Sequence, residues 1–177
     1  MDILINGDYF MFYYINMFFI CSIFGYFMET SLKTFLFKGM NNGILFGPWI
    51  PIYGIGAMII CLVSDQVFKR FHFRKSVKFV IAVLLSTFLL TMLEFLTGNL
   101  IEMLFHKVSW NYNQLKFHFG HYIALEISLV WALFTILFMK FIRPFIDKFI
   151  IKIPKSLSVL FFGILVVDFF FSILLMF

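Results

Sequence analysis

Five long apolar segments constrain this chain more than any other feature, because a helix that spans a bilayer needs about 20 mostly apolar residues. They cover approximately residues 10–37, 49–68, 79–105, 122–139 and 156–177. Only 13% of the residues are charged, whereas soluble domains carry about 25%. A soluble fold of this size could not cover so much apolar surface. The sequence therefore predicts an all-α integral membrane protein, with one transmembrane domain over residues 1–177 built from five helices.

The distribution of lysine and arginine predicts how the chain crosses the membrane. Most of the 14 Lys and Arg residues lie on one side of a five-span chain: Lys69, Arg70, Arg74, Lys75, Lys78, Lys140, Arg143, Lys148, Lys152 and Lys155. Because cytoplasmic loops carry the excess of positive charge, we expect the N-terminus inside and the C-terminus outside. The excess of Phe, Ile, Lys and Asn is typical of AT-rich bacterial genomes, so the expected location is a bacterial cell membrane.

Segment PFIDKFIIKIP, residues 144–154, has the pattern of a helix that lies on a membrane. Phe145, Phe149 and Ile153 follow one another at i, i+4 and i+8, and Lys148 and Lys152 share another face. This pattern predicts a short interfacial helix on the cytoplasmic surface. It would serve either as a membrane anchor or as a docking element for a cytoplasmic partner.

Segment NNGILFGPWIPIYG, residues 41–54, interrupts the apolar pattern between the first two spans. Irregular backbone at membrane depth is tolerated only where protein buries it or water reaches it. We therefore expect a re-entrant or irregular Gly/Pro-rich loop that lines a site, with a surface turn as the alternative. The second span is expected to be interrupted early by Pro51, Gly54 and Gly56, since proline and glycine weaken helices.

Five acidic residues lie in or at the ends of spans, namely Glu29, Glu94, Glu102, Glu126 and Asp168. Each would cost roughly 2.5–3.5 kcal/mol at mid-helix if it faced lipid. Because the spans alternate in direction, all five fall toward the same side as the Gly/Pro-rich loop. Their positions predict a carboxylate-lined polar cavity near the extracytoplasmic side. The alternative is that each carboxylate is structural and pairs with a lysine, a tyrosine or a backbone amide.

Helical spacing predicts which faces these acids share. Small and polar residues at such spacing mark helix–helix contacts. They form one stripe of Ser22, Gly25, Glu29 and Lys33, and another of Thr87, Thr91, Glu94, Gly98 and Glu102. Tyr122 and Glu126 are spaced i, i+4, as are Asp168 and Ser172. Glu126 and Ser128 point to nearly opposite sides of their span, so one of them must find another partner.

The third loop, HKVSWNYNQLKFHFGHY, adds aromatic and polar residues on the same side. His118 and His121 are three apart, as metal ligands on a helix can be, but without a third ligand we expect neither metal nor cofactor. The buried thiols Cys21 and Cys61 are expected to act as small hydrophobic groups. The candidate cavity residues are Glu29, Asn42, Gly47, Pro48, Trp49, Pro51, Tyr53, Gly54, Glu94, Glu102, Trp110, Tyr112, His121, Glu126 and Asp168.

Five stretches of this sequence together resemble a bacterial family, the putative ABC-transporter type IV permeases. They are FFICSIFGYFMETSLKT, NNGILFGPWIPIYGIGA, LLTMLEFLTGNLIEMLF, WNY and GHYIALEISLVWALF, within about residues 18–143. The residues that match the family pattern are Glu29, Glu94, Trp110, Tyr112, Glu126, Ser128 and Trp131. The chain departs from that pattern at three positions. Asn42 and His121 stand where arginine is usual in the family, and Asn111 stands where aspartate is usual. The resemblance implies a permease-type subunit that works with a separate ATPase.

Three functions compete on this sequence. A permease-type subunit would need a separate ATPase, since the chain has no Gly-rich phosphate loop ending in Lys and Ser or Thr. A membrane-embedded enzyme acting on lipid or envelope intermediates would use Glu29, Glu94 and Glu126 as acid and base. A non-catalytic accessory or scaffold subunit would need the carboxylates for folding alone. The expected partners are the lipid bilayer, an ATPase subunit or a second copy in a homodimer, and not nucleic acid.

Overall fold

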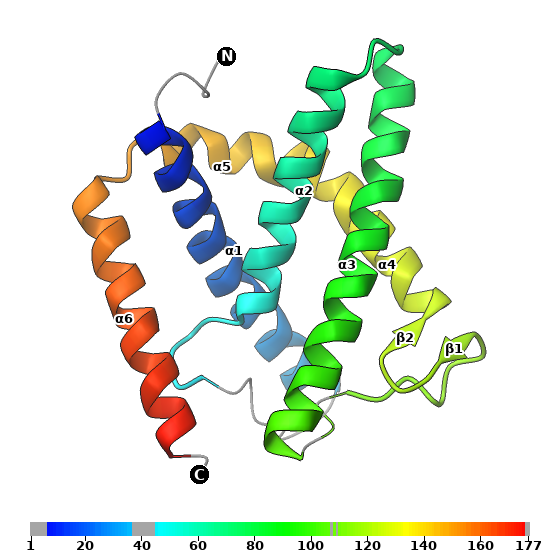
Figure 1. Ribbon diagram of the computed structural model, residues 1–177, viewed down its shortest axis with the longest axis vertical. Coiled ribbons are helices and arrows are strands. Elements are labelled where there is room, and N and C mark those ends of the chain that lie inside the picture. Colours follow the sequence, from blue (N-terminus) through cyan, green and yellow to red (C-terminus); the bar gives the residue numbers. More distant parts are fainter. Residues whose placement is uncertain (1–6, 37–44, 107, 109, 176–177) are drawn as a thin grey trace. The chain divides into compact units, whose positions relative to one another are not determined.

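The computed structural model describes residues 7–36, 45–106, 108 and 110–175, and this part of the chain is mostly helical (Figure 1). The helices are α1 Gly7–Leu36, α2 Pro51–Arg70, α3 Lys75–Phe105, α4 Leu125–Leu137, α5 Arg143–Ile150 and α6 Lys155–Leu174, with a π-helix over Phe138–Ile142. The strands β1 His118–Phe119 and β2 Ile123–Ala124 pair antiparallel, with His118 opposite Ala124.

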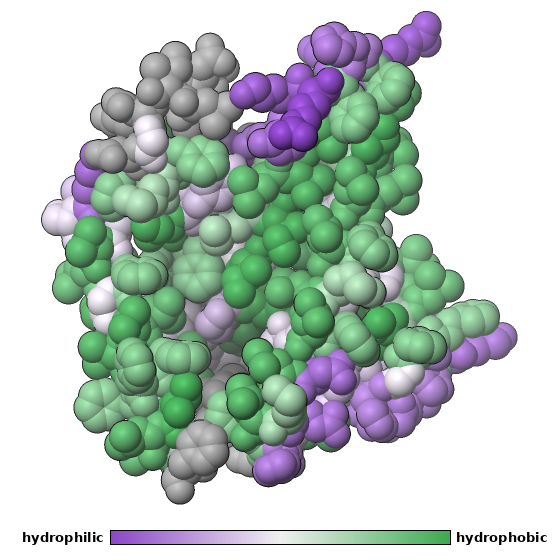
Figure 2. Space-filling view, in the orientation of Figure 1, coloured by the Kyte–Doolittle hydropathy of each residue, from purple (hydrophilic) through white to green (hydrophobic). Residues whose placement is uncertain are grey.

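Five helical segments in the described residues are long and apolar enough to cross a membrane, which confirms the predicted all-α membrane fold. They are Phe10–Ser31, Pro51–Arg70, Lys75–Phe105, Leu125–Ile150 and Lys155–Leu174. Their outward faces are strongly apolar: Leu84 on α3 is 64% exposed and Phe170 on α6 is 66% exposed. Figure 2 shows this apolar surface along α3 and α6. Such continuous apolar surface needs lipid around it, since soluble monomers rarely expose large apolar patches.

The chain divides into two compact units. The first unit, unit 1, comprises Met1–Ala57 and Phe145–Phe177, and the second, unit 2, comprises Met58–Pro144. Helix α2 therefore begins in unit 1 and ends in unit 2, while α5 begins in unit 2 and ends in unit 1.

In unit 1, glycines allow α1 and the start of α2 to pack closely. A Cβ atom on Gly25 would collide with the ring of Tyr53, and one on Gly54 would collide with Ser22 Oγ and the backbone carbonyl of Phe18. Small residues at such positions let helix backbones approach each other in membranes. The expected interruption of the second span is wrong, because α2 runs unbroken from Pro51 to Arg70. Pro51 is its first residue, where a missing N–H costs nothing.

We expect Gly54→Ala to destabilise the protein by about 1–3 kcal/mol, because the new methyl group has no room against α1. Gly163→Ala is the matched control, since Gly163 also lies within a helix but nothing lies within 4 Å of its added Cβ. That control should leave stability unchanged or raise it by up to about 1 kcal/mol through helix propensity. Thermal unfolding in detergent measures both, and equal midpoints for the two variants would contradict the close packing.

Helix α6 packs on α1 through polar as well as aromatic contacts. The hydroxyl of Ser158 donates to Asn16 Oδ1 at 2.7 Å, and both side chains are buried. The rings of Phe19 and Phe161 lie 5.8 Å apart between centroids. Nearby, the hydroxyl of Tyr13 donates to Asp147 Oδ1 at 2.8 Å. Polar pairs inside a membrane bundle hold helices in one register, because lipid offers no alternative partner.

In unit 2, α3 and α4 form an antiparallel pair. Lys140 lies over the ring of Phe79 near the start of α3, and Tyr122 lies against Gly98 near its end. Between them, Thr91 Oγ1 donates to Ser128 Oγ at 3.0 Å. The buried residues of α3 include Thr91, Glu94 and Gly98, which are members of the stripe that the spacing predicts.

The segment predicted as a separate surface helix over residues 144–154 continues the fourth span. The π-helix Phe138–Ile142 joins α4 to α5 without a break, and α5 ends at Ile150. Short π-helical segments inside α-helices are frequent at functional sites. Within α5, Ile146 and Ile150 are buried, whereas Phe145 is 61% exposed and Phe149 is 50% exposed. The position of this segment on a membrane surface stays a prediction.

Candidate functional site

Asp168, on α6 in unit 1, holds the end of the Gly/Pro-rich segment. Its Oδ1 accepts the backbone N–H of Phe46 at 3.2 Å, and its Oδ2 accepts the N–H of Gly47 at 3.1 Å and Nε1–H of Trp49 at 2.8 Å. Ser172, one turn further along α6, donates to Oδ1 at 3.4 Å, as the i, i+4 spacing predicts. Hydrogen bonds to a charged acceptor are roughly twice as strong as neutral ones. Asp168 therefore clamps the turn segment, residues 45–50, to α6.

The turn segment is irregular because of its own residues. The N–H of Trp49 bonds to the carbonyl of Gly47 at 2.8 Å, and a Cβ on Gly47 would collide with the indole of Trp49. The N–H of Ile50 bonds to the carbonyl of Ser22 in α1 at 3.0 Å. Four backbone N–H groups of the segment, those of Phe46, Gly47, Trp49 and Ile50, are thus satisfied by protein, as irregular backbone in a membrane requires. Pro48 is exposed, and Asn42 lies outside the described residues.

Glu29, on α1, is joined to α2 by a hydrogen bond. The hydroxyl of Tyr53 donates to Glu29 Oε2 at 3.3 Å. Tyr53 is brought there by the close approach of its ring to Gly25. Lys33, which shares the predicted stripe with Glu29, has a side chain outside the described part of the structure. Glu29 and Asp168 therefore each connect a different pair of segments within unit 1.

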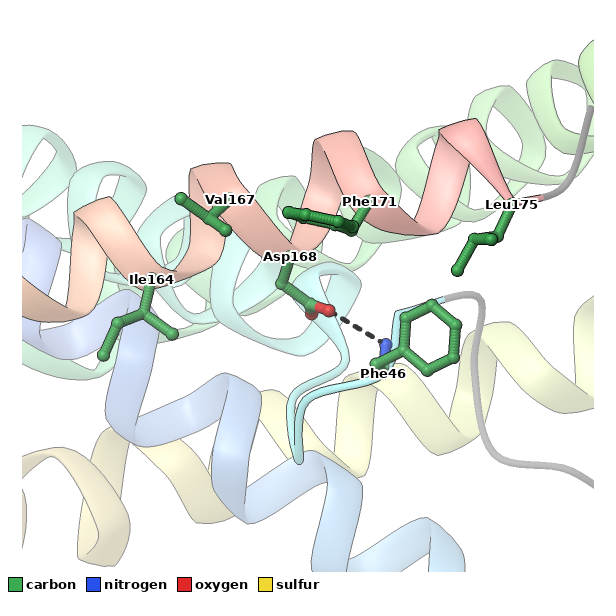
Figure 3. Close-up of a pocket in the computed structure, with 6 residues that line it drawn as sticks. All are labelled: Phe46, Ile164, Val167, Asp168, Phe171 and Leu175. Carbon is green, nitrogen blue, oxygen red and sulfur yellow. Dashed lines mark hydrogen bonds between the residues drawn. The ribbon is translucent and has the colours of Figure 1, made fainter.

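An open groove of about 450 Å³ lies beside Asp168. Figure 3 shows Asp168 pointing from α6 toward Phe46, with apolar side chains of α6 on either side. The lining residues are Phe46, Ile164, Val167, Asp168, Phe171 and Leu175. Because the oxygens of Asp168 already accept hydrogen bonds from the turn segment, the groove presents mainly hydrocarbon.

Glu94, on α3, is the most buried of the predicted carboxylates, at 6% exposed. Its Oε1 accepts a hydrogen bond from the hydroxyl of Tyr112 at 2.5 Å, and its Oε2 accepts one from Trp131 Nε1 at 2.9 Å. Tyr112 comes from the loop after α3, and Trp131 comes from α4. Both donors are neutral, so within the described residues neither contact brings a positive charge to the carboxylate.

Glu102, two turns further along α3, accepts a hydrogen bond from the hydroxyl of Tyr122 at 2.8 Å. Burial raises the pKa of Tyr122, and the hydrogen bond and negative charge of Glu102 raise it further. Tyr122 therefore remains a neutral donor. The predicted helical pair of Tyr122 with Glu126 is wrong, because α4 begins at Leu125 and leaves Tyr122 outside the helix. The ring of Trp110 packs edge-on against Tyr122, at 5.7 Å between centroids.

Glu126, in the first turn of α4, bonds to the hairpin rather than to α3. Its Oε1 accepts the N–H of Phe117 at 3.1 Å, whereas Ser128 contacts Thr91. The two residues thus find different partners, as their opposite faces on the helix predict. The other oxygen of Glu126 is buried and has no partner among the described residues. His121 lies beside Asn113, with 3.1 Å between its Nδ1 and the amide nitrogen.

The structure sorts the predicted site residues into two groups. Glu29, Tyr53 and Asp168 with its turn segment belong to unit 1, and Glu94, Glu102, Glu126 with their aromatic partners belong to unit 2. One cavity shared by all of them stays a prediction. Trp131 was missed as a site residue on spacing alone, because an isolated tryptophan in an apolar span gives no sign of what it contacts. Only the family resemblance pointed to it.

The described residues contain no group of three or more His, Cys, Asp or Glu side chains that could hold a metal ion. Cys21 and Cys61 are buried thiols. The chemistry on offer is that of partly buried carboxylates held by neutral donors, on helices that can cross a membrane.

Comparison with known proteins gives one match. A family model described as "Putative ABC-transporter type IV" matches residues 16–177. No curated protein and no solved structure matches the chain.

Proposed function

Because the chain belongs to the putative ABC-transporter type IV family, we propose that it is the permease-type membrane subunit of a transporter whose ATPase is a separate chain. The five apolar helices supply the membrane-spanning part. These 177 residues contain no phosphate loop of the form G-x-x-x-x-G-K-[S/T], so ATP would be bound by the partner. The bacterial cell membrane, with the N-terminus in the cytoplasm, is part of the same proposal.

The observation that carries this proposal is the environment of Glu94. It is a buried carboxylate between α3, α4 and the following loop, held by Tyr112 and Trp131. A group of this kind inside a membrane is costly to keep and typically marks a substrate or ion pathway. In a permease it would form part of the polar lining that a substrate meets. In this proposal a cationic or hydrogen-bonding substrate would supply the compensation that its two neutral donors do not.

Helix α5 is the part of this chain that we propose as the docking element for the ATPase. Ile146 and Ile150 are buried and hold the helix in place, while Phe145 and Phe149 are exposed. The two exposed rings contact each other, with centroids 5.1 Å apart, and Lys152 lies 5.9 Å from the ring of Phe149. Aromatic side chains, phenylalanine among them, are enriched in protein interfaces relative to the rest of the surface.

The double variant Phe145→Ala/Phe149→Ala should lose the ATPase when the protein is purified from its native membrane. Truncation of an aromatic anchor typically costs about 2 kcal/mol or more in an interface, so the ATPase that co-purifies should fall at least about tenfold. The measurement is ATP hydrolysis in the purified complex, together with the mass of the bound chain. Because Ile146 and Ile150 remain, the variant should still fold.

The matched control is Phe169→Ala/Phe170→Ala, which removes another pair of exposed, touching phenylalanines, on α6. It should leave ATPase association unchanged. If the Phe145/Phe149 variant keeps its ATPase, α5 is not the docking element. If no ATPase accompanies the unmodified protein from its own membrane, the permease role itself fails.

A further inference from the structure

One end of unit 2 gathers positive charge from three helices and the loop between two of them. Figure 2 shows the hydrophilic side chains gathered where α2 ends and α3 begins. The cationic residues there, called the basic end below, are Lys69 and Arg70 of α2, Arg74 of the loop, Lys75 and Lys78 of α3, and Lys140 of the π-helix. The π-helix belongs to this group because Lys140 Nζ lies 5.4 Å from the ring centroid of Phe79, one turn after Lys75.

The basic end has almost no negative charge to balance it. Asp65, one turn before Lys69 on α2, is paired with Arg143, whose Nη2 lies 2.8 Å from Asp65 Oδ1. Arg143 also donates to Ser64 Oγ at 2.8 Å. No ion pair within the described residues involves Lys69, Arg70, Arg74 or Lys75, and all four are exposed. Their charges are therefore available to an anionic partner.

Two aromatic rings stand among these cations. Phe71 is 41% exposed and Phe73 is 55% exposed, and their rings stack with centroids 5.8 Å apart and an angle of 14°. In water, such a pair of exposed rings would be unfavourable. The loop joins two helices that can cross a membrane, so it lies at the level of the lipid headgroups. Aromatic side chains at that level place their rings among the headgroups and upper acyl chains.

The basic end is held in a defined shape. Lys78 Nζ donates to the backbone carbonyl of Phe68 at 3.0 Å, which ties the first turn of α3 to the last turn of α2. The N–H of Phe71 donates to the carbonyl of Val67 at 3.2 Å, and the N–H of Lys78 donates to the carbonyl of Arg74 at 3.1 Å. These hydrogen bonds therefore hold Arg70, Arg74 and the stacked rings in one defined arrangement.

We propose that the basic end is a binding site for the phosphate headgroups of anionic phospholipids, with Phe71 and Phe73 inserted beside them. Arginine suits phosphate because its guanidinium offers several donors in a planar fork. Basic residues next to a membrane contribute about 1 kcal/mol each toward anionic lipid. The occupant is a lipid rather than an acidic protein surface because the stacked rings lie at the membrane level. An acidic protein partner is the alternative that the experiment excludes or reveals.

The test measures binding of phosphatidylglycerol and phosphatidylcholine to the detergent-purified protein by native mass spectrometry. The unmodified protein should bind phosphatidylglycerol more tightly than phosphatidylcholine. In Arg70→Gln/Arg74→Gln/Lys75→Gln, the affinity for phosphatidylglycerol should fall about 100-fold at low salt, with phosphatidylcholine binding unchanged. High salt should weaken phosphatidylglycerol binding to the unmodified protein by screening. Phe71→Ala/Phe73→Ala should weaken binding of the same lipid, and its unfolding midpoint in phosphatidylcholine confirms that it folds.

The matched control is Lys116→Gln, measured beside Arg74→Gln: each removes one exposed cation, the first from the loop after α3 and the second from the basic end. Lys116→Gln should keep the affinity of the unmodified protein for phosphatidylglycerol, whereas Arg74→Gln should lower it about fivefold. An equal loss in this control would overturn the proposal, because binding would then follow total charge and not this site. Equal binding of both lipids by the unmodified protein would also overturn it. The proposal would likewise be overturned if the triple variant of the basic end kept its affinity for phosphatidylglycerol but lost a co-purifying protein. That result would identify the basic end as a protein-docking surface.

Discussion

Replacing Asp168 with alanine should lower the free energy of unfolding by about 2–4 kcal/mol, which would be among the largest single-residue effects in this protein. The carboxylate accepts hydrogen bonds from the N–H groups of Phe46 and Gly47 and from the indole of Trp49. Trp49 is 7% exposed, so its Nε1–H would be left without water as well as without its acceptor. Thermal unfolding in detergent gives the unfolding midpoint, and tryptophan fluorescence reports whether the turn segment has detached from α6.

Two milder variants separate the clamp from a general effect of altering α6. Asp168→Asn keeps one acceptor oxygen, so we expect it to lose about half as much stability as the alanine variant. Ser172→Ala removes only the 3.4 Å contact to Oδ1 and should cost under about 1 kcal/mol. An alanine variant as stable as Ser172→Ala would show that Asp168 does not hold the turn.

Glu94→Ala is expected to cost a similar amount, about 2–4 kcal/mol, because it removes two hydrogen bonds to a buried acceptor. Those two bonds also connect three parts of unit 2, since Tyr112 lies in the loop and Trp131 on α4. Glu94→Gln should fall between the unmodified protein and the alanine variant. Its amide oxygen can still accept from one donor, but its amide nitrogen would face the other. Thermal unfolding in detergent measures this order.

The glutamine variant also decides what Glu94 is for. If Glu94→Gln folds but the complex loses its transport activity, the carboxylate serves the permease proposed here. If it folds and retains full function, both the permease pathway through Glu94 and the alternative of an embedded enzyme with an acid–base glutamate fail, and a scaffold role remains. Glu102→Gln is the matched control. Glu102 accepts a single hydrogen bond from Tyr122, so its replacement should cost less.

Much of this protein could be predicted because lipid limits the possible structures. A backbone in hydrocarbon must satisfy its own hydrogen bonds, so long apolar segments can only be helices, and the described residues contain five such segments. Helical spacing likewise predicted that Thr91, Glu94 and Gly98 share a buried face. It also predicted that Glu126 and Ser128 would find different partners. These are properties of a single helix, and the order of its residues is enough to determine them.

Spacing along one helix could not predict which residue of another helix each side chain would meet. Asp168 bonds to Phe46 and Gly47, more than a hundred positions earlier, and Asn16 bonds to Ser158. These partners depend on which helix faces pack together. Spacing also could not predict the effect of Pro51. A proline breaks a helix in its interior but is tolerated at its first position, and the structure shows that α2 begins at Pro51. The sequence by itself determined the helices and their polar faces. Only the tertiary structure decided their partners, because those contacts form between segments that packing alone brings together.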